Sequence, residues 1–384
     1  MNKKMFLRLL LMISTIDILY ADSLIKEVNG YIRTGLQVTD IDQDDTYKDM
    51  ALGGKLHIET NAYNGISAGV SFYTTNALGW HEGYGDAYGM PFFDGNNNSY
   101  TIVGEAYIQG EWKNTLLKIG RQAIDTPFAD TDDIGMVPNS FEAALIVNKD
   151  ITDTTITVAQ LQKMAGVDAE EPSQFRSING DDNAQTIGIT YEGVKGLTLS
   201  GWYYYLQDFE IENIAYLEAT YETNIKPFTL ELGLQYASQN YTLPSLDDAD
   251  IFGISAALGH ENSGLSFSIA YNRNNGSAAS NGFGGGPFFT SSEHLTLAEA
   301  GDKGKATFYT LEWDAESIGI DDLSLGIGKL YLESENDIKS NETDLTASYD
   351  FTDTLSVQAY YSDINDKINV INYQNLRVFV NYTF

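Results

Sequence analysis

The feature of this sequence that most constrains its fold is a repeated alternation of apolar and polar residues. From Lys26 onward, about 18 short segments alternate with the period of a β-strand, and turns separate them. A strand with one apolar face and one charged or small face fits either a half-solvated sheet or a barrel with a wet lumen. The clearest segments are 52–62, 102–112, 228–236 and 344–351, and in 102–112 the pattern places Ile102, Ala106 and Ile108 opposite Glu105 and Tyr107.

The lengths of the connections between these segments favour the barrel. Short turns alternate with long polar connections, of which the longest are 76–98, 124–141, 165–183 and 274–303. Short turns on one rim and long loops on the other are typical of up-and-down barrels in the outer membrane, and a β-sandwich is not expected to alternate so regularly. We therefore predict an all-β fold, a transmembrane antiparallel β-barrel of roughly 16 to 18 strands with 18 favoured, wide enough for an aqueous channel.

No domain boundary is visible along the barrel sequence. We therefore predict a single barrel domain over residues 22–384. The glycine-rich run 281–289 (NGFGGGPFF) is interpreted as the tip of a surface loop. The connections 40–50 and 333–341 are also expected to be long loops.

The last strand-like segment, 376–384, agrees with a closed barrel. Its apolar face carries Leu376, Val380, Tyr382 and Phe384, and its other face is polar except for Phe379. In a soluble domain such a strand would be a sticky edge, whereas in a closed barrel the last strand pairs with the first. A terminal aromatic residue on such a strand resembles the signal that the outer-membrane assembly machinery reads, and we assign that signal to Tyr382 and Phe384.

The N-terminal residues 1–21 are predicted to be a cleaved signal peptide. A basic start with Lys3, Lys4 and Arg8 precedes an apolar run, and a small residue stands at Ala21. No later segment approaches the roughly 18 to 20 apolar residues that a spanning helix requires. We therefore expect the mature chain to reside in the outer membrane of a Gram-negative-type bacterium as a barrel in contact with lipid.

The charge of the chain is strongly acidic, with 22 basic and 54 acidic residues and a net charge of −32. The predicted signal peptide holds three basic residues and one acidic residue, which leaves 19 and 53 and a net charge of −34. Nucleic acid is therefore not an expected partner. The chain has no cysteine, which excludes disulfides and metal–thiolate chemistry.

One long connection, within residues 116–144 (LLKIGRQAIDTPFADTDDIGMVPNSFEAA), has a recognisable motif. Gly-Arg-Gln is followed by Thr-Pro, an acidic pair, a proline and a phenylalanine. The motif resembles that of OprD-type outer-membrane porins, whose third long loop folds into the barrel after a similar strand. The resemblance in layout covers the whole mature chain, and it departs at Gly135, where family members commonly carry an arginine. The matching residues are Gly120, Arg121, Gln122, Thr126, Pro127, Asp132, Asp133, Pro138 and Phe141.

The resemblance implies a narrow part of the pore in which loop carboxylates oppose basic residues on the wall. Such rings of charge set ion preference, because low-dielectric walls focus the electric field. Since the chain is so acidic and has only five arginines after the signal peptide, we expect a weak preference for cations rather than anions. The acidic side is predicted to be Asp125, Asp130, Asp132, Asp133 and Glu142, and the basic side Arg33, Lys55, Lys118 and Arg121.

Enzyme and metal sites are not expected from the sequence. The four histidines, His57, His81, His260 and His294, are scattered without a paired metal spacing, and no hydrolase motif occurs. We interpret His57 as a pore-lining residue. The carboxylates of 130–133 lack the full calcium-loop spacing, so neither a metal nor a cofactor is predicted.

The sequence therefore predicts a porin through which small hydrophilic solutes and cations diffuse passively. One alternative is a substrate-specific channel with a saturable site. Another is an adhesin or receptor barrel that works through exposed loops such as 76–98 and 274–303. Monomer and homotrimer are both left open.

Overall fold

The computed structural model describes residues 24–42, 45–82, 91–180, 182–207 and 209–384. Within these residues, eighteen antiparallel strands form one closed barrel, as the sequence pattern predicts. The predicted signal peptide lies outside the described residues. No helix in the described part of the chain is long and apolar enough to cross a membrane.

The elements alternate with turns and loops throughout the chain. Two short 3-10 helices, η1 and η2, and a two-residue strand, β8, lie in connections between barrel strands. The elements are β1 Ile25–Ile41, β2 Thr46–Thr60, β3 Ile66–His81, β4 Tyr100–Trp112, β5 Thr115–Gln122, β6 Ser140–Asn148, β7 Thr154–Ala165, β8 Arg176–Ser177, β9 Ala184–Val194, β10 Leu197–Leu206, β11 Ile211–Ile225, β12 Phe228–Tyr241, β13 Ala249–His260, β14 Leu265–Asn274, η1 Leu297–Ala300, β15 Lys305–Asp314, η2 Ala315–Ile318, β16 Leu323–Glu333, β17 Lys339–Thr352, β18 Leu355–Asp366 and β19 Ile371–Thr383.

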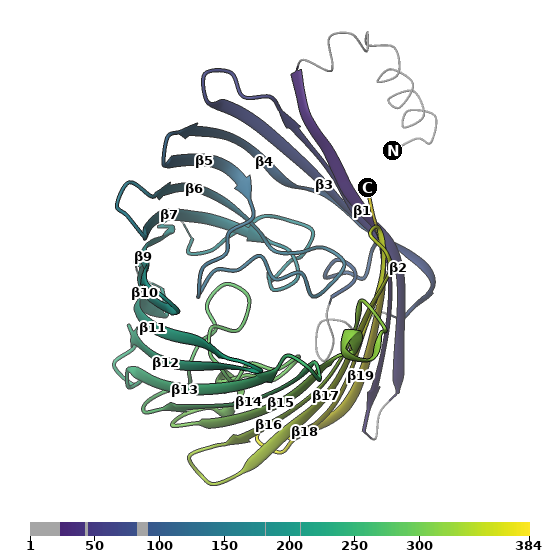
Figure 1. Cartoon of the computed structure of the whole chain (residues 1–384), viewed down its shortest axis with the longest axis vertical. Helices are drawn as coiled ribbons and strands as arrows, with labels where there is room; N and C mark the ends of the chain where they lie inside the picture. Colours follow the sequence, from purple (N-terminus) through teal and green to yellow (C-terminus); the bar gives the residue numbers. More distant parts are fainter. Residues whose placement is uncertain (1–23, 43–44, 83–90, 181, 208) are drawn as a thin grey trace.

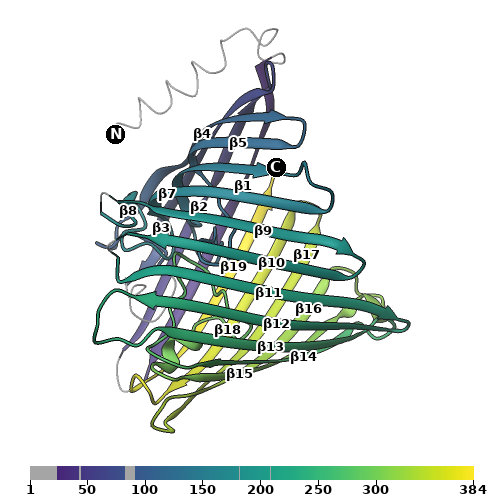
Figure 2. The same ribbon diagram turned by 90° about the vertical axis from the view of Figure 1, so that its left-hand side faces the viewer.

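The barrel closes where β1 pairs with β19. The antiparallel register runs from Tyr31 opposite Thr383 to Ile41 opposite Tyr373. The backbone of Phe384 extends this pairing by two hydrogen bonds of 3.0 Å with Gly30. No barrel strand among the described residues is therefore left as an open edge, which is what a bilayer demands. In the side view the strands of the near wall cross those of the far wall, as tilted strands of a barrel do (Figure 2).

The connections differ in length between the two rims. On one rim, which we call the short-turn rim, turns such as 113–114 and 195–196 join neighbouring strands, and β1 begins and β19 ends there. The opposite rim, the long-loop rim, carries 82–99, 123–139, 166–183 and 275–304. Two connections predicted to be long are short, 42–45 and 334–338, because the adjoining strands continue farther than the sequence pattern suggests.

The outward face of the barrel is apolar and the inward face is mainly polar. Along β19, Leu376, Val380 and Tyr382 point outward and are exposed, while Asn375 and Arg377 point inward and are buried. This alternation is the one predicted from the sequence. Exposed aromatic residues of the outward face include Trp80, Trp112, Tyr191, Tyr203, Tyr221, Phe252, Tyr271, Tyr309, Tyr331 and Tyr382.

One predicted face is wrong, because β4 contains an irregularity. Ser71 pairs with Glu105 and the next residue, Phe72, pairs with Val103, so Gly104 is an extra residue in β4. The extra residue shifts the alternation by one position. Ile102 therefore faces inward and is buried instead of sharing the outward face of Ile108.

Segments of the long loops fill part of the barrel. Figure 1 shows them inside the ring of strands. Their apolar residues join two buried clusters with side chains of the barrel wall, one around Phe128, Phe288 and Leu297 and one around Phe92 and Met136. The position of the loops is thus fixed by burial of apolar side chains.

Candidate pore constriction

Loop 123–139 enters the lumen, as predicted, and is anchored at two places. At the first, Phe128 is fully buried and meets the rings of Tyr204, Tyr216 and Phe288 edge to face, with centroids 5.6 to 6.0 Å apart. The backbone nitrogen of Phe128 also donates a hydrogen bond of 3.2 Å to the Tyr204 hydroxyl. These contacts tie the first half of the loop to the wall formed by β10 and β11.

The second anchor is Met136, which is fully buried against the opposite side of the wall. Its side chain lies over Gly35 of β1 and Gly53 of β2. A Cβ added at Gly35 would lie 2.6 Å from the Met136 sulfur and 2.9 Å from the Phe92 ring. Since β-carbon contacts that short do not occur, glycine at position 35 makes room for the loop.

Loop 275–304 also folds inward, so interpreting 281–289 as an exposed tip is wrong. The Phe283 backbone forms hydrogen bonds of 2.9 Å with Phe128 and 3.3 Å with Asp130. Phe288 is 3% exposed. Farther along the loop, buried Glu342 of β17 accepts hydrogen bonds from the Ser292 hydroxyl (2.6 Å) and from the backbone nitrogens of residues 294 (2.9 Å) and 295 (2.7 Å). The phenylalanines of the glycine-rich run were the signal in the sequence for burial of this loop.

Arg33 and Asp133, predicted to lie on opposite sides, form a bidentate ion pair. The guanidinium of Arg33 on β1 donates to the two Asp133 oxygens at 2.7 and 2.9 Å. It also donates to the Asn381 side-chain oxygen at 2.7 Å and to the Gly135 carbonyl at 2.6 Å. The Arg33 side chain is 8% exposed and that of Asp133 is 44% exposed. The pair therefore holds the tip of the loop against the seam between β1 and β19.

Arg377 of β19 is a second arginine at this seam and was not predicted as a site residue. It donates to Glu293 of loop 275–304 at 2.5 Å and to the Ile134 carbonyl of loop 123–139 at 3.0 Å. It is 1% exposed. Arg377 thus contacts both inward loops, and its place on the polar face of the last strand was the only signal in the sequence.

The remaining loop carboxylates lie near one another. Burial and the charges of Asp168 and Asp130 raise the pKa of Asp132 to about 7. Burial and the charge of Asp125 raise the pKa of Asp130, and burial raises the pKa of Asp168. Asp168 comes from loop 166–183 and was missed in the sequence. At neutral pH this group of four carboxylates therefore carries less than its full charge.

The other predicted residues lie on the wall and are paired there. Glu142 of β6 does not belong to the loop side, since it is in register with Arg121 of β5 and lies 3.6 Å from it. Lys163 of β7 approaches the same carboxylate at 3.2 Å. Arg121 also lies over the Phe175 ring of loop 166–183, 4.3 Å from its centroid. Glu142 and Arg121 are therefore neighbours, because adjacent strands place them side by side.

Lys55 and Lys118 lie closer to the short-turn rim than the inward loops. The Lys55 ammonium is 2.8 Å from the Glu105 carboxylate. That of Lys118 lies 3.8 Å from the centroid of the Tyr107 ring. The closest partners of these two lysines are wall residues, whereas Arg33 forms its ion pair with the loop carboxylate of Asp133.

Comparison with known proteins agrees with this architecture. The sequence profile described as "outer membrane porin, OprD family" matches residues 94–330. No curated protein matches the chain by sequence at a significant level.

Solved structures of similar fold include porins of Pseudomonas and Acinetobacter. The crystal structure of Pseudomonas aeruginosa OccK8 (OprE) is 17% identical with a TM-score of 0.77, covering 93% of this chain and 98% of its own. That of Acinetobacter baumannii OccAB4 is 16% identical with a TM-score of 0.79, covering 93% and 97%. A BenF-like porin from Pseudomonas fluorescens is 16% identical with a TM-score of 0.77, covering 93% and 98%. At these identities the likeness concerns the fold.

Proposed function

We propose that this chain, which belongs to the OprD family of outer membrane porins, lets small hydrophilic solutes and ions diffuse passively across the membrane. We also propose a weak preference for cations. The family places it in the outer membrane, in contact with lipid, and its members are channels rather than enzymes. The distribution of charge around the lumen supports the preference for cations.

The lumen face of the wall from β9 to β18 supports the preference for cations. The described strands of this wall contain four basic residues, and the strand register places each of them on the outward face. Arg273 is opposite Phe252, Lys305 is opposite Arg273, Lys329 is opposite Tyr309, and Lys339 is opposite Glu333. The inward faces of the same strands carry carboxylates and no lysine or arginine. These carboxylates include Glu192, Glu218, Glu222, Glu231, Glu312 and Asp344.

Three of these carboxylates lie together near the short-turn rim. Glu222 and Glu231 are opposite each other in the register of β11 and β12. With Glu192 they line one hollow of the wall. A local excess of negative charge raises the concentration of cations and lowers that of anions in the water beside it.

The reversal potential under a KCl gradient tests the role of this wall. We expect wild-type protein to reverse on the cation side and the double variant E222Q/E231Q to reverse closer to zero. The matched control Asp250→Asn removes a carboxylate from the outward side of β13, where it bonds with Tyr236. It is expected to reverse like wild type. An unchanged reversal potential in the double variant would refute the assignment of cation preference to this wall.

The rate of solute entry into liposomes distinguishes passive diffusion from a saturable site. We expect the rate to rise in proportion to concentration and to fall as solutes become larger. Saturation at millimolar solute would instead favour a substrate-specific channel. The arginines at the seam, Arg33 and Arg377, would then be the first positions to vary.

A receptor role through exposed loops has less support. Loop 275–304 is an example of a loop that this role would use, and its residues contact the lumen wall and loop 123–139. Binding of a partner that is lost on deletion of 91–98, with conductance unchanged, would favour the receptor instead.

A further inference from the structure

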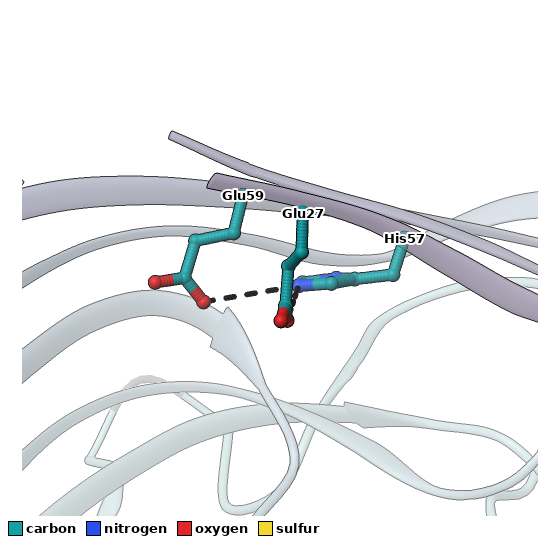
Figure 3. A group of neighbouring side chains, drawn as sticks. All are labelled: Glu27, His57 and Glu59. Carbon is teal, nitrogen blue, oxygen red and sulfur yellow. Dashed lines mark ion pairs between the residues drawn. The ribbon is translucent and has the colours of Figure 1, made fainter. Parts of the chain in front are cut away.

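Three side chains with metal-binding atoms meet on the lumen wall near the short-turn rim, away from the inward loops. They are Glu27 of β1 and His57 and Glu59 of β2. Glu27 and Glu59 are directly opposite each other in the strand register, and His57 lies two residues before Glu59 on the same face. Figure 3 shows both carboxylates converging on one ring nitrogen of His57. That nitrogen, Nε2, is 3.9 Å from an oxygen of each glutamate, and the three atoms lie within 4.8 Å of one another.

Hydrogen bonds behind the ring fix the tautomer of His57. Its Nδ1 atom is 2.8 Å from the Ser71 hydroxyl, and that hydroxyl donates its single proton to Glu105 at 2.9 Å. Glu105 can only accept, because it is ionised beside Lys55 at 2.8 Å. Ser71 must therefore accept from His57, so Nδ1 carries the proton. In the neutral ring, Nε2 then presents a lone pair to the two glutamates.

The oxygen atoms that face His57 are also held in place. One oxygen of Glu59 accepts from Lys26 at 3.1 Å and from Ser67 at 3.4 Å, and the other oxygen, which faces the ring, accepts from the Tyr107 hydroxyl at 3.3 Å. The facing oxygen of Glu27 accepts one hydrogen bond of 3.2 Å from Asn29. His57 and Glu59 are buried to 7% and 8% exposure, while the Glu27 side chain is 43% exposed to the lumen.

With the His57 ring neutral, this arrangement is unfavourable without a bound cation. Like charges directly opposite each other in a strand pair are destabilising, and a neutral imidazole adds a third lone pair to the same space. Lys26 neutralises only the far oxygen of Glu59. A divalent cation among the three atoms would satisfy all of them at once.

We propose that Glu27, His57 and Glu59 form a binding site for a divalent transition-metal ion of the zinc class. Three atoms spaced 3.9 to 4.8 Å apart surround a point about 2.3 to 2.5 Å from each, and a small rotation of the partly exposed Glu27 side chain would shorten these distances to the roughly 2.0 to 2.2 Å of zinc–nitrogen and zinc–carboxylate bonds. Imidazole suits zinc and its neighbours in the first transition row, whereas calcium and magnesium take oxygen ligands. Ser71 orients the ring from behind, as residues beyond the ligands do in metal sites. Because Glu27 faces the lumen, water completes the coordination.

The site lies outside the proposed constriction and does not depend on the ion preference of the channel. It replaces the expectation from sequence that no metal is bound. The sequence offered little signal, because Glu27 is thirty residues from His57 and only the pairing of β1 with β2 brings them together.

Metal binding is tested on the folded full-length chain in detergent, stripped with a chelator and dialysed against zinc chloride. We expect one zinc ion per chain by elemental analysis, and X-ray absorption with nitrogen or oxygen ligands at about 2.0 Å and an imidazole signature. His57→Ala and Glu27→Gln are expected to remove this zinc, and Ser71→Ala to weaken binding by roughly 10- to 100-fold. Millimolar calcium is expected not to displace it.

The matched control is His260→Ala, a histidine of the same rim whose ring contacts Ser263 and Phe228. It is expected to bind zinc like wild type. Glu27→Gln changes a partly exposed side chain, so it keeps the test valid if His57→Ala does not fold. Absence of stoichiometric zinc in the wild type would overturn the proposal, as would zinc that survives both His57→Ala and Glu27→Gln.

Discussion

The ion pair between Arg33 and Asp133 leads to the sharpest prediction about the channel. The structure places a positive and a negative charge together where loop 123–139 meets the seam. Arg33→Gln should leave one uncompensated negative charge there and increase the preference for cations. Asp133→Asn should leave one uncompensated positive charge and decrease it. The double variant removes both charges and should reverse like wild type.

The size of these shifts follows from simple electrostatics. A unit charge roughly 5 Å from the path of an ion changes the ion's energy by about 0.8 kcal/mol in water. Screening at 0.1 M salt, with a Debye length of about 10 Å, reduces this to about 0.5 kcal/mol. The charge acts with opposite sign on K⁺ and Cl⁻, so each single variant should change the permeability ratio by about fivefold.

The assay is the reversal potential of single channels at 0.1 M KCl and again at 1 M, where the shifts should shrink. Heat stability of the folded form is measured alongside, because loss of either partner should cost about 1 to 2 kcal/mol. This is less than for a fully buried pair, since Asp133 is partly exposed. Shifts of both single variants in the same direction, or a double variant that behaves like either single one, would refute the reasoning.

Two further predictions concern the inward loops. With the pKa of Asp132 raised to about 7, this carboxylate should be about nine-tenths ionised at pH 8 and about one-tenth ionised at pH 6. Cation preference should therefore decrease as the pH is lowered from 8 to 6. Asp132→Asn should flatten that dependence in reversal-potential measurements. Glu342→Ala removes three hydrogen bonds to loop 275–304, each worth about 0.5 to 1.5 kcal/mol. It should raise the mean conductance and its flicker, whereas Asp350→Ala on the same strand should not.

The barrel could be predicted from sequence because its pattern is local and repeated. The period of two, the alternation of turns and loops, and the last strand from Leu376 to Phe384 each depend on neighbouring residues only. The predicted outward face of Ile102 was wrong because Gly104 adds one residue to β4. The local alternation of residues does not indicate such a single extra residue. The assembly signal assigned to Tyr382 and Phe384 stays a prediction.

The site was less predictable, because contacts between distant segments decide it. The motif of loop 123–139 indicated that the loop enters the lumen, but not that Asp133 would pair with Arg33 one hundred residues earlier. Asp132 is buried and Asp168 approaches it from another loop, so Asp132 carries less negative charge at neutral pH than the sequence alone suggests. Arg377 contacts both inward loops, and only closure of the barrel brings it there.

The central claim is that this chain forms a water-filled channel with a cation-preferring lumen. Single-channel recording in a planar bilayer under a KCl gradient tests it most directly. We predict steady open channels whose reversal potential lies on the cation side. Absence of conductance from correctly folded protein would contradict the channel itself, and a reversal potential on the anion side would contradict the account of its charge.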